Sequence, residues 1–516
     1  MTEPPHSEVL DRVLDGFLRA YLPRCRWFGG KGRAIASLKF AESVPIVDGR
    51  YRAGIFFIDV NYRGGGSEIY LLPLAVATGR EARRVLKHHP RTVSLEMVRN
   101  AKGSIGLLHD AAVDRRFLGF LLRAILRRRV IRGTSGGKIV ASPIGRIPSR
   151  GGTLRPSPLS PEQSNSSATF GRRFFLKLYR RLAPGENPEL EIGRFLAKKR
   201  FAGVPRLRGA IEYRPRAGEP MTLAVLQDFV PKATDGWTAA VEAAGRSFGR
   251  ALERPALPGR RPKDGLGDFR SAVDLLGRRT AELHGALASG KRSRAFAPER
   301  ISPAARLRLL RSWKGLARRV FALLARRSRD LRAGLRESAR KLHSMEGRVL
   351  REFRNVLQFP FSSPRIRCHG DLHFGQTLFT RRNVLITDFE GEPARPVAER
   401  REKHSALKDV AGMIRSFDYA AAVALRSFAA KPGAMRRLSG IAAYWTREAA
   451  EEFLRSYKKH AEGFTFLPET REEMELLLKL HFLEKAIYEL GYELENRPDW
   501  VEIPLRALLK MLGRSS

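Results

Sequence analysis

The spacing of apolar residues predicts two helices and a strand meander in the first quarter of the chain. Residues 8–22 carry apolar side chains at helical intervals, which predicts an opening amphipathic helix. Residues 35–78 instead hold short apolar runs on either side of a turn signal at 63–67, so we expect a meander of strands there. Helical spacing returns at 115–129, where apolar residues alternate with arginines.

The pattern changes from strands to helices near residue 232. A stretch rich in glycine, serine and proline at 142–167 precedes an apolar strand at 173–179. The other expected elements are a helix at 188–200, strands near 207–211 and 223–229, helices beyond 232, and two short strands near 377–380 and 384–388.

This order of elements predicts an α+β fold in three parts. We expect a strand-rich N-terminal cap at 1–112 and a small β-rich lobe at 113–231. A large, mostly helical lobe should follow at 232–516.

Composition is that of a globular chain, and the charge is its unusual property. The 516 residues are 43% hydrophobic and 9% aromatic, which disfavours a fibrous, collagen-like or wholly disordered protein. However, 96 Lys+Arg against 53 Asp+Glu leave a net charge of +43. That charge leaves nucleic acid, anionic membranes and phosphorylated ligands open as partners. It disfavours a small polycationic substrate, unless the substrate's own site is acidic.

Cysteine usage and the N-terminal residues indicate the compartment. Cys25 and Cys368 cannot form a disulfide framework in so long a chain, so we expect free thiols in a reducing environment. The first residues are acidic and proline-containing rather than signal-like, and no run approaches about 20 apolar residues. We therefore expect a cytoplasmic protein without a membrane span.

Two further segments invite a functional interpretation. Residues 301–355 hold 16 Lys+Arg against 4 Asp+Glu, with leucines at helical period, and we expect surface helices with a solvated arginine face. Nucleic acid is the less favoured partner because no zinc finger, RNA-recognition signature or stacked aromatics accompany these arginines. The glycine-rich run at 133–139 lacks the first glycine and the final hydroxyl residue of a Walker A loop, and we expect a turn between strands.

A catalytic-loop pattern carries the clearest chemistry. His369, Gly370 and Asp371 are followed by Gln376 five residues after the aspartate, and by Asp388 after two short apolar runs. This is the order of a kinase catalytic loop and its metal-binding aspartate. Asp371 would orient the attacking hydroxyl and accept its proton, while Gln376 and Asp388 would hold Mg²⁺ against the phosphates of ATP.

A buried lysine completes the kinase pattern. Lys177 lies within the apolar strand at 173–179, where a charge is costly unless it meets a phosphate or a carboxylate. Glu191 on the following helix is the expected ion-pair partner, with Glu186 and Glu189 as alternatives.

Long stretches of the chain resemble the bacterial maltokinases, which belong to the protein-kinase-like and aminoglycoside-phosphotransferase-like group. The similar stretches are RWFGGKGR at 26–33, EQSNSS at 162–167, HGDLHFGQTL at 369–378, the run from 388 to 421 and the run from 484 to 509. The resemblance implies a bilobal protein-kinase-like fold and ATP-dependent phosphorylation of maltose to maltose 1-phosphate. It also implies a place in α-glucan and trehalose metabolism, with trehalose synthase as a possible partner; no synthase domain is present in this sequence.

The resemblance also assigns site residues. It gives Lys177 to the ATP phosphates, Glu191 to Lys177, Asp371 to the base, and Gln376 with Asp388 to Mg²⁺. In place of a glycine-rich loop, small polar residues would face the phosphates: Gln163, Ser164, Asn165, Ser166 and Ser167. The adenine would lie against a hinge that contains Gln227, Asp228 and Val230. Relative to protein kinases, this chain has Gly370 for arginine, Gln376 for asparagine and Glu390 for glycine.

For the acceptor sugar we expect a pocket of polar groups and aromatic faces on a C-terminal helix. Glu484, Tyr488 and Tyr492 recur every four residues and so share one helical stripe, with Arg497 and Trp500 at its end. Core packing is the alternative for the two tyrosines.

His373 and the activity as a whole have alternatives too. His373 could contact the sugar or brace the catalytic loop. The chain could also phosphorylate another sugar or small hydroxyl acceptor, or be an inactive scaffold that binds a polyanion or a partner enzyme.

Overall fold

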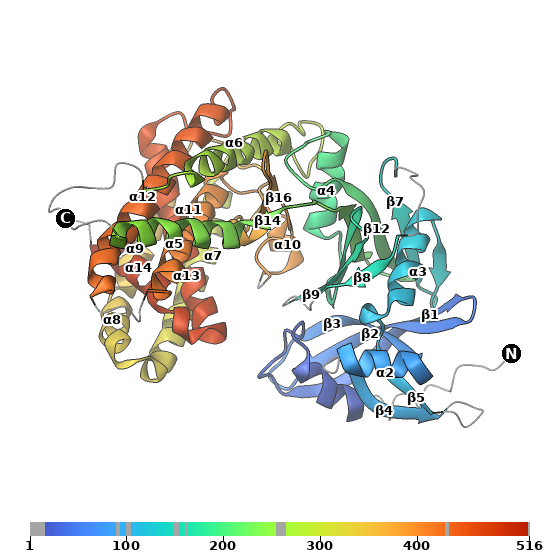
Figure 1. The fold of residues 1–516 in the computed structure, drawn as a ribbon. Helices are drawn as coiled ribbons and strands as arrows, with labels where there is room; N and C mark the ends of the chain where they lie inside the picture. Colours follow the sequence, from blue (N-terminus) through green and yellow to red (C-terminus); the bar gives the residue numbers. More distant parts are fainter. Residues whose placement is uncertain are drawn as a thin grey trace. The chain divides into compact units, whose positions relative to one another are not determined.

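The computed structural model describes residues 16–88, 93–99, 105–147, 154–159, 164–253, 265–393, 395–428 and 433–513. The chain divides into two compact units (Figure 1). One comprises the residues up to Lys198 together with Pro205–Pro231, and the other comprises Lys199–Val204 and the residues from Lys232 onward. Whether the cap and the small lobe are separate domains that divide at residue 112 stays a prediction.

The first unit contains two antiparallel sheets. The N-terminal sheet has the strand order β1-β2-β3-β5-β4, with β11 paired to β3. Its strands are β1 (Ile35–Asp48), β2 (Tyr51–Tyr62), β3 (Ser67–Ala77), β4 (Val93–Arg99), β5 (Ile105–Asp110) and β11 (Arg181–Leu182). The first three confirm the predicted meander. Helix α2 (Gly79–His88) follows β3. Of the predicted opening helix, residues 16–21 are helical and lead into the 3-10 turn η1 (Leu22–Arg24), whereas residues 8–15 lie outside the described part of the chain.

The second sheet has seven strands in the order β6-β7-β12-β13-β10-β9-β8. Their bounds are β6 (Val130–Arg132), β7 (Lys138–Pro143), β8 (Pro156–Pro158), β9 (Asn165–Phe170), β10 (Phe174–Tyr179), β12 (Leu207–Arg214) and β13 (Met221–Asp228). Helix α4 (Pro188–Lys198) joins β11 to β12. The predicted strands at 173–179, 207–211 and 223–229 and the helix at 188–200 are therefore confirmed.

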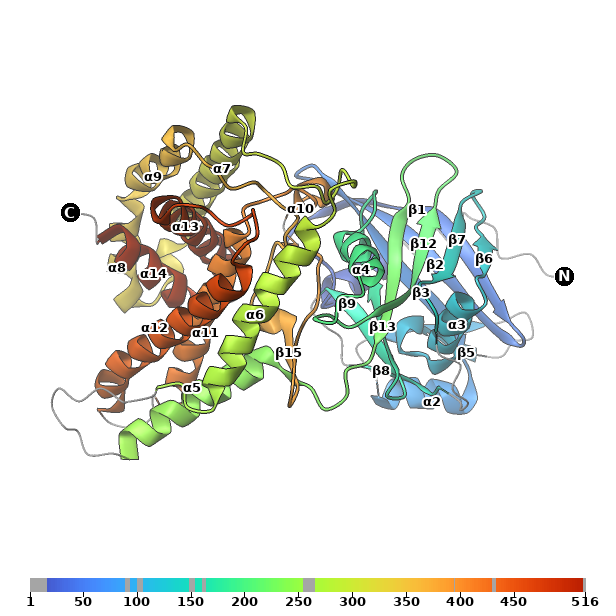
Figure 2. The same cartoon turned by 90° about the horizontal axis from the view of Figure 1, so that it is seen from above.

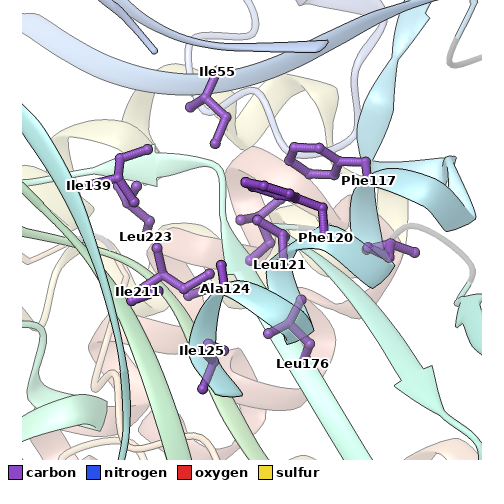
Figure 3. Close-up of a cluster of buried hydrophobic side chains, with 14 of the residues drawn as sticks. Ile55, Phe117, Phe120, Leu121, Ala124, Ile125, Ile139, Leu176, Ile211 and Leu223 are labelled. Carbon is purple, nitrogen blue, oxygen red and sulfur yellow. The ribbon is translucent and has the colours of Figure 1, made fainter. Parts of the chain in front are cut away.

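Helix α3 (Arg115–Leu126) links the two sheets through a shared hydrophobic core. Asp114 caps the helix by accepting a hydrogen bond from the Arg116 amide at 2.8 Å, which satisfies one of the free N–H groups of the first turn. Apolar side chains of α3 lie between Ile55 of β2 and residues of the second sheet such as Ile139 and Leu223 (Figure 3). One core thus continues across residue 112.

A buried glutamate ties β1 to the glycine-rich turn at 133–137, which joins β6 to β7. The carboxylate of Glu42 accepts hydrogen bonds from the amides of Ser135 and Gly137 at 2.8 and 3.1 Å, and from the Tyr213 hydroxyl at 3.1 Å. A Cβ on Gly133 would lie 2.5 Å from the Glu42 carboxyl carbon, so this position needs glycine. The run is a turn between strands, as predicted, and it surrounds an anion that the chain itself supplies.

The second unit is mainly helical and contains a short three-stranded sheet. Helix α12 (Ala434–Ala461) packs against α5 (Gly236–Glu253), α6 (Phe269–Ala288) and α11 (Leu407–Arg426) (Figure 2). The sheet order is β14-β15-β16, with β14 (Thr234–Asp235), β15 (Thr377–Phe379) and β16 (Val384–Ile386). The helices are α5 (Gly236–Glu253), α6 (Phe269–Ala288), α7 (Pro303–Arg327), α8 (Ala333–His343), α9 (Glu346–Gln358), α10 (Val397–Arg400), α11 (Leu407–Arg426), α12 (Ala434–Ala461), α13 (Arg471–Asn496) and α14 (Glu502–Gly513).

The basic segment at 301–355 forms helices α7 and α8 and most of α9. Their apolar faces join α13 and α14 in one core that contains Trp313, Phe321 and Phe353, and most of the arginines are exposed. In the described residues, no helix is long and apolar enough to cross a membrane.

Candidate active site

The catalytic loop is held in place by a buried aspartate from α11. The carboxylate of Asp409 accepts hydrogen bonds from the backbone amides of His369 and Gly370 at 2.7 and 2.9 Å. His284 of α6 approaches the same carboxylate through Nε2 at 3.1 Å and contacts the Tyr457 hydroxyl through Nδ1 at 2.9 Å. Burial alone would raise the pKa of Asp409, but these hydrogen bonds lower it, so the carboxylate is ionised.

His369 connects the catalytic loop to the segment that follows β16. Its Nδ1 accepts a hydrogen bond from the Asp371 amide at 3.3 Å, and its Nε2 lies 2.9 Å from the Thr387 carbonyl oxygen. This pairing requires the proton on Nε2, which donates to the carbonyl. The ring therefore fixes the backbone of Asp371 relative to the residue that precedes Asp388.

Asp371 is paired with a lysine that sequence reasoning did not assign. Nζ of Lys485, on α13, lies 2.6 Å from Oδ1 of Asp371 and 3.4 Å from Oε1 of Glu392. Burial would raise the pKa of Asp371, but the Lys485 ammonium more than offsets this and holds the pKa well below its usual value. Asp371 is therefore a carboxylate at neutral pH, as a group that orients a hydroxyl must be.

Asp388 and Gln376 come from adjacent backbone segments. The Thr387 amide donates to the Gln376 carbonyl oxygen at 2.9 Å, next to the β15–β16 ladder. Asp388 has a φ of 63°, a left-handed conformation that is uncommon for a residue other than glycine and recurs at functional sites. Carboxylate and amide oxygens are suitable Mg²⁺ ligands, so this pair fits the metal that the kinase pattern implies.

A polar pocket lies beside Asp371. The empty space there, counted together with the open solvent at its mouth, is about 250 Å³. Its charged and polar lining residues are Asp371, Glu392, Lys408, Asp409, His481, Glu484 and Lys485. The predicted residue Glu484 is thus in the pocket, together with five charged or polar neighbours that the sequence analysis did not assign.

Two cations and a histidine lie around Glu484. Its Oε1 accepts from Arg395 at 2.7 Å and lies 3.7 Å from Nζ of Lys408, and its Oε2 lies 3.2 Å from Nδ1 of His481. Burial would raise the pKa of Glu484, but Lys408, His481 and Arg395 together hold it well below the usual value. Arg395 also pairs with Glu392.

The other expected acceptor residues lie outside the pocket lining. The Lys485 ammonium lies over the ring of Tyr488, 4.8 Å from its centroid, which places this tyrosine one contact away from Asp371. Tyr492 instead stacks under Arg497, which also covers Trp500 and pairs with Glu493 at 3.0 Å.

His373 braces the catalytic loop. Its Nδ1 accepts the Gly375 amide at 3.0 Å, and its Nε2 lies 3.9 Å from Oδ2 of Asp371. Burial lowers the pKa of His373, although Asp371 acts in the opposite direction. Its contact with a sugar stays a prediction.

The lysine of the first unit pairs with a different glutamate from the one expected. Nζ of Lys177 lies 2.9 Å from Oε2 of Glu189, and both side chains are almost fully buried. The same carboxylate accepts from the Tyr179 hydroxyl at 2.7 Å and from the Gln227 amide at 3.1 Å. Glu189, one of the alternatives to Glu191, is therefore a partner of Lys177, because the first turn of α4 directs Glu189 toward β10. The pairing of Lys177 with Glu191 stays a prediction.

The small polar residues expected around the phosphates are mostly parts of a strand. Gln163 lies outside the described residues, and Ser164 precedes β9. Asn165, Ser166 and Ser167 are in β9 and pair with Tyr179, Leu178 and Lys177, respectively. The Ser166 hydroxyl accepts a hydrogen bond from Arg180 at 2.8 Å.

At the expected hinge, the carboxylate of Asp228 binds Arg208 through two bonds of 2.7 Å. The Gln227 side chain points to Glu189, and Val230 follows the end of β13. Adenine contacts by Gln227, Asp228 and Val230 stay predictions.

A β-rich lobe with a buried lysine–glutamate pair, and a helical lobe with a His-x-Asp loop, define a protein-kinase-like fold. Residues 21–114 match the maltokinase N-terminal cap domain. The chain is 28% identical over 360 residues to a glucosamine kinase of Mycolicibacterium smegmatis, covering 70% of this chain and 80% of that protein. It is 26% identical over 358 residues to a glucosamine kinase of Streptacidiphilus jiangxiensis, covering 68% of this chain and 72% of that protein.

Solved structures show the same fold. A glucosamine kinase in complex with glucosamine, ADP and inorganic phosphate superposes with a TM-score of 0.61 at 18% identity, covering 99% of this chain and 100% of that chain. A second crystal form of a glucosamine kinase gives a TM-score of 0.63 at 19% identity, covering 97% and 99% of the two chains. The chain thus combines a maltokinase-type cap with the aminoglycoside-phosphotransferase-like fold, which confirms the predicted α+β kinase-like architecture.

Proposed function

We propose that this protein is an ATP- and Mg²⁺-dependent sugar kinase that converts maltose to maltose 1-phosphate. The observation that carries the proposal is the Asp371 carboxylate in the wall of a polar pocket, held ionised by Lys485 at 2.6 Å. The maltokinase-type cap at 21–114 supports maltose as the acceptor.

In this proposal the sugar hydroxyl attacks the γ-phosphorus of ATP. Its oxygen forms the new P–O bond, the bond to the β–γ bridging oxygen breaks, and ADP leaves. Asp371 orients the hydroxyl and takes its proton, while Lys177, fixed by Glu189, binds phosphate oxygens. Gln376 and Asp388 would hold Mg²⁺, which neutralises phosphate charge when it is bound.

The charges in the pocket favour a neutral acceptor. Asp371 is paired with Lys485, Glu392 with Lys485 and Arg395, and Glu484 with Arg395 and Lys408. An ammonium group on the sugar would have to compete with these cations for a carboxylate. A neutral sugar needs only hydrogen bonds to groups that are already oriented.

Glucosamine is the second candidate because two relatives are named glucosamine kinases. The deciding experiment supplies ATP, Mg²⁺ and, separately, maltose, glucosamine or glucose, and identifies the product by ³¹P and ¹H NMR. We expect phosphate on the anomeric carbon of maltose. If only glucosamine is phosphorylated, glucosamine replaces maltose as the acceptor. If the protein binds ATP but phosphorylates none of the sugars, the inactive kinase-like scaffold is favoured instead.

If the maltose assignment holds, trehalose synthase is a candidate partner enzyme, as the family resemblance implies. Co-elution of the two proteins in size-exclusion chromatography would test that association.

A further inference from the structure

A fully buried arginine joins the cap to β9, the strand that pairs with the Lys177 strand β10. Arg180 directly follows β10 and is 1% exposed. A buried guanidinium is costly unless its N–H groups are satisfied. The groups that satisfy it therefore show which parts of the molecule it holds together.

On one side, Arg180 contacts the cap. Its Nη2 donates to Oδ2 of Asp110 at 2.7 Å, and its Nη1 donates to the Leu71 carbonyl oxygen at 3.4 Å. The guanidinium also lies over the Trp27 ring, 5.0 Å from the centroid. Asp110 is itself fixed, because its other oxygen accepts the Ala112 amide at 2.9 Å.

On the other side, Arg180 holds the strand expected to face the phosphates. Its Nε donates to the Ser166 hydroxyl at 2.8 Å, and the next residue of β9, Ser167, pairs with Lys177. The backbone continues the same link, since the residues after Arg180 form β11 and pair with Tyr70 and Ile69 of the cap. The strand that carries Lys177 thus runs directly into the sheet of the cap.

We propose that Asp110 and Arg180 are positioning residues through which the cap sets the affinity for ATP. The cap holds the guanidinium, and the guanidinium fixes β9 next to the strand of Lys177. This inference rests on the proposed function, because it assigns a regulator to the same nucleotide site. It gives the cap a role in nucleotide binding although Asp110 itself has no expected contact with ATP.

The test compares two buried aspartates four residues apart. Asp110→Asn weakens the contact with Arg180, whereas Asp114→Asn removes a charge at similar depth whose partners are Arg116, the start of α3 and, at 3.9 Å, Nε2 of His109. Binding of ATP with Mg²⁺ is measured by calorimetry, and Tm by thermal melts. We expect Asp110→Asn to raise the Kd for ATP at least about fivefold, and Asp114→Asn to change it less than about twofold at a comparable loss of Tm.

A double-variant cycle separates coupling from two independent effects. Ser166→Ala removes the other end of the link, so combined with Asp110→Asn it should weaken ATP binding no further than the stronger single variant does. Arg180→Lys keeps the positive charge but loses the planar guanidinium with its several N–H donors. Its Kd for ATP should therefore resemble that of Asp110→Asn. The inference would be overturned if the losses of ATP affinity added up in the double variant, or if Asp110→Asn and Asp114→Asn had equal Kd values for ATP. Wild-type protein that binds no ATP would instead overturn the proposed function.

Discussion

Two residues from distant parts of the second unit adjust the loop that contains Asp371. Lys485 sets the charge state of Asp371 across 114 positions of the chain, and Asp409 fixes the loop backbone. A carboxylate with so low a pKa stays ionised through the mildly acidic range. In the proposed reaction, Asp371 would therefore contribute through orientation of the hydroxyl more than through strength as a base.

Replacing Asp371 by asparagine should abolish phosphoryl transfer and leave ATP binding within a few-fold of wild type. The amide keeps the shape but cannot accept the hydroxyl proton. Turnover is followed by coupled ADP release and binding by calorimetry, with the surface variant Asp274→Asn as control. Near-wild-type turnover would exclude Asp371 as the base.

Glu493 makes stability depend on pH. Burial raises its pKa to about 7, against the opposing effect of Arg497, from an ordinary value of 4.5. Between these two values the folded protein binds more protons than the unfolded chain, so stability falls as the pH rises. Glu493→Gln, which resembles the protonated form, should therefore raise Tm by about 2 °C or more at pH 8 and hardly change it at pH 4.5.

Thermal melts at both pH values check this expectation. The exposed neighbour Glu495→Gln is the control and should leave the pH dependence as it is in the wild type. An equal shift of Tm at the two pH values would contradict the role assigned to Glu493.

The sequence pattern predicted candidate catalytic residues but not all of their structural partners. His369, Asp371, Gln376 and Asp388 follow a local pattern, so their spacing was enough to propose them, and their catalytic roles stay predictions. The choice between Glu189 and Glu191 depends on the rotation of α4 against β10, which residue types do not encode. A lysine at position 485, inside an apolar stretch of α13, was the available signal for the partner of Asp371.

At the scale of elements, the geometry of α13 explains which acceptor residues reach the pocket. Glu484 and Tyr492 share a helical stripe, but eight residues span about 12 Å along a helix axis. One small pocket therefore includes Glu484 and Lys485, while Tyr492 packs with Arg497 further along. The strands and most helices were predictable because their apolar periods are strong, whereas pairing order needed the three-dimensional fold.

Close packing of α11 against the catalytic loop gives an element-scale prediction. A Cβ on Gly412 would lie 2.7 Å from the Leu372 carbonyl oxygen, so Gly412→Ala must displace the backbone next to Asp371. We expect kcat to fall at least about tenfold, because small misplacements of reacting groups are costly.

Gly440→Ala on α12 is the matched control, since its Cβ would meet open space. It should stabilise the helix by about 1 kcal/mol and leave kcat unchanged. Steady-state kinetics and thermal melts distinguish the two variants, and a wild-type kcat in Gly412→Ala would show that the loop tolerates the shift.

For the whole molecule, the net charge of +43 implies repulsion within the folded state. Raising NaCl from about 20 mM to about 200 mM should increase Tm, because the added ions screen that repulsion. A variant with Arg326 and Arg340 both changed to glutamate has a net charge of +39, two units less per substitution. At low salt its Tm should be higher than that of the wild type, and NaCl should raise this Tm by less. An unchanged dependence of Tm on NaCl would show that repulsion among these charges does not cause the salt effect.

The contact between Glu42 of β1 and the glycine-rich turn at 133–137 has a consequence for amide hydrogen exchange. The Ser135 side chain is exposed, yet its amide donates to the buried Glu42 carboxylate at 2.8 Å. Deuterium can enter that amide only when the carboxylate withdraws from the turn. The exchange rate of the Ser135 amide thus reports how often β1 separates transiently from the β6–β7 turn. It can be measured at this single site in the intact protein.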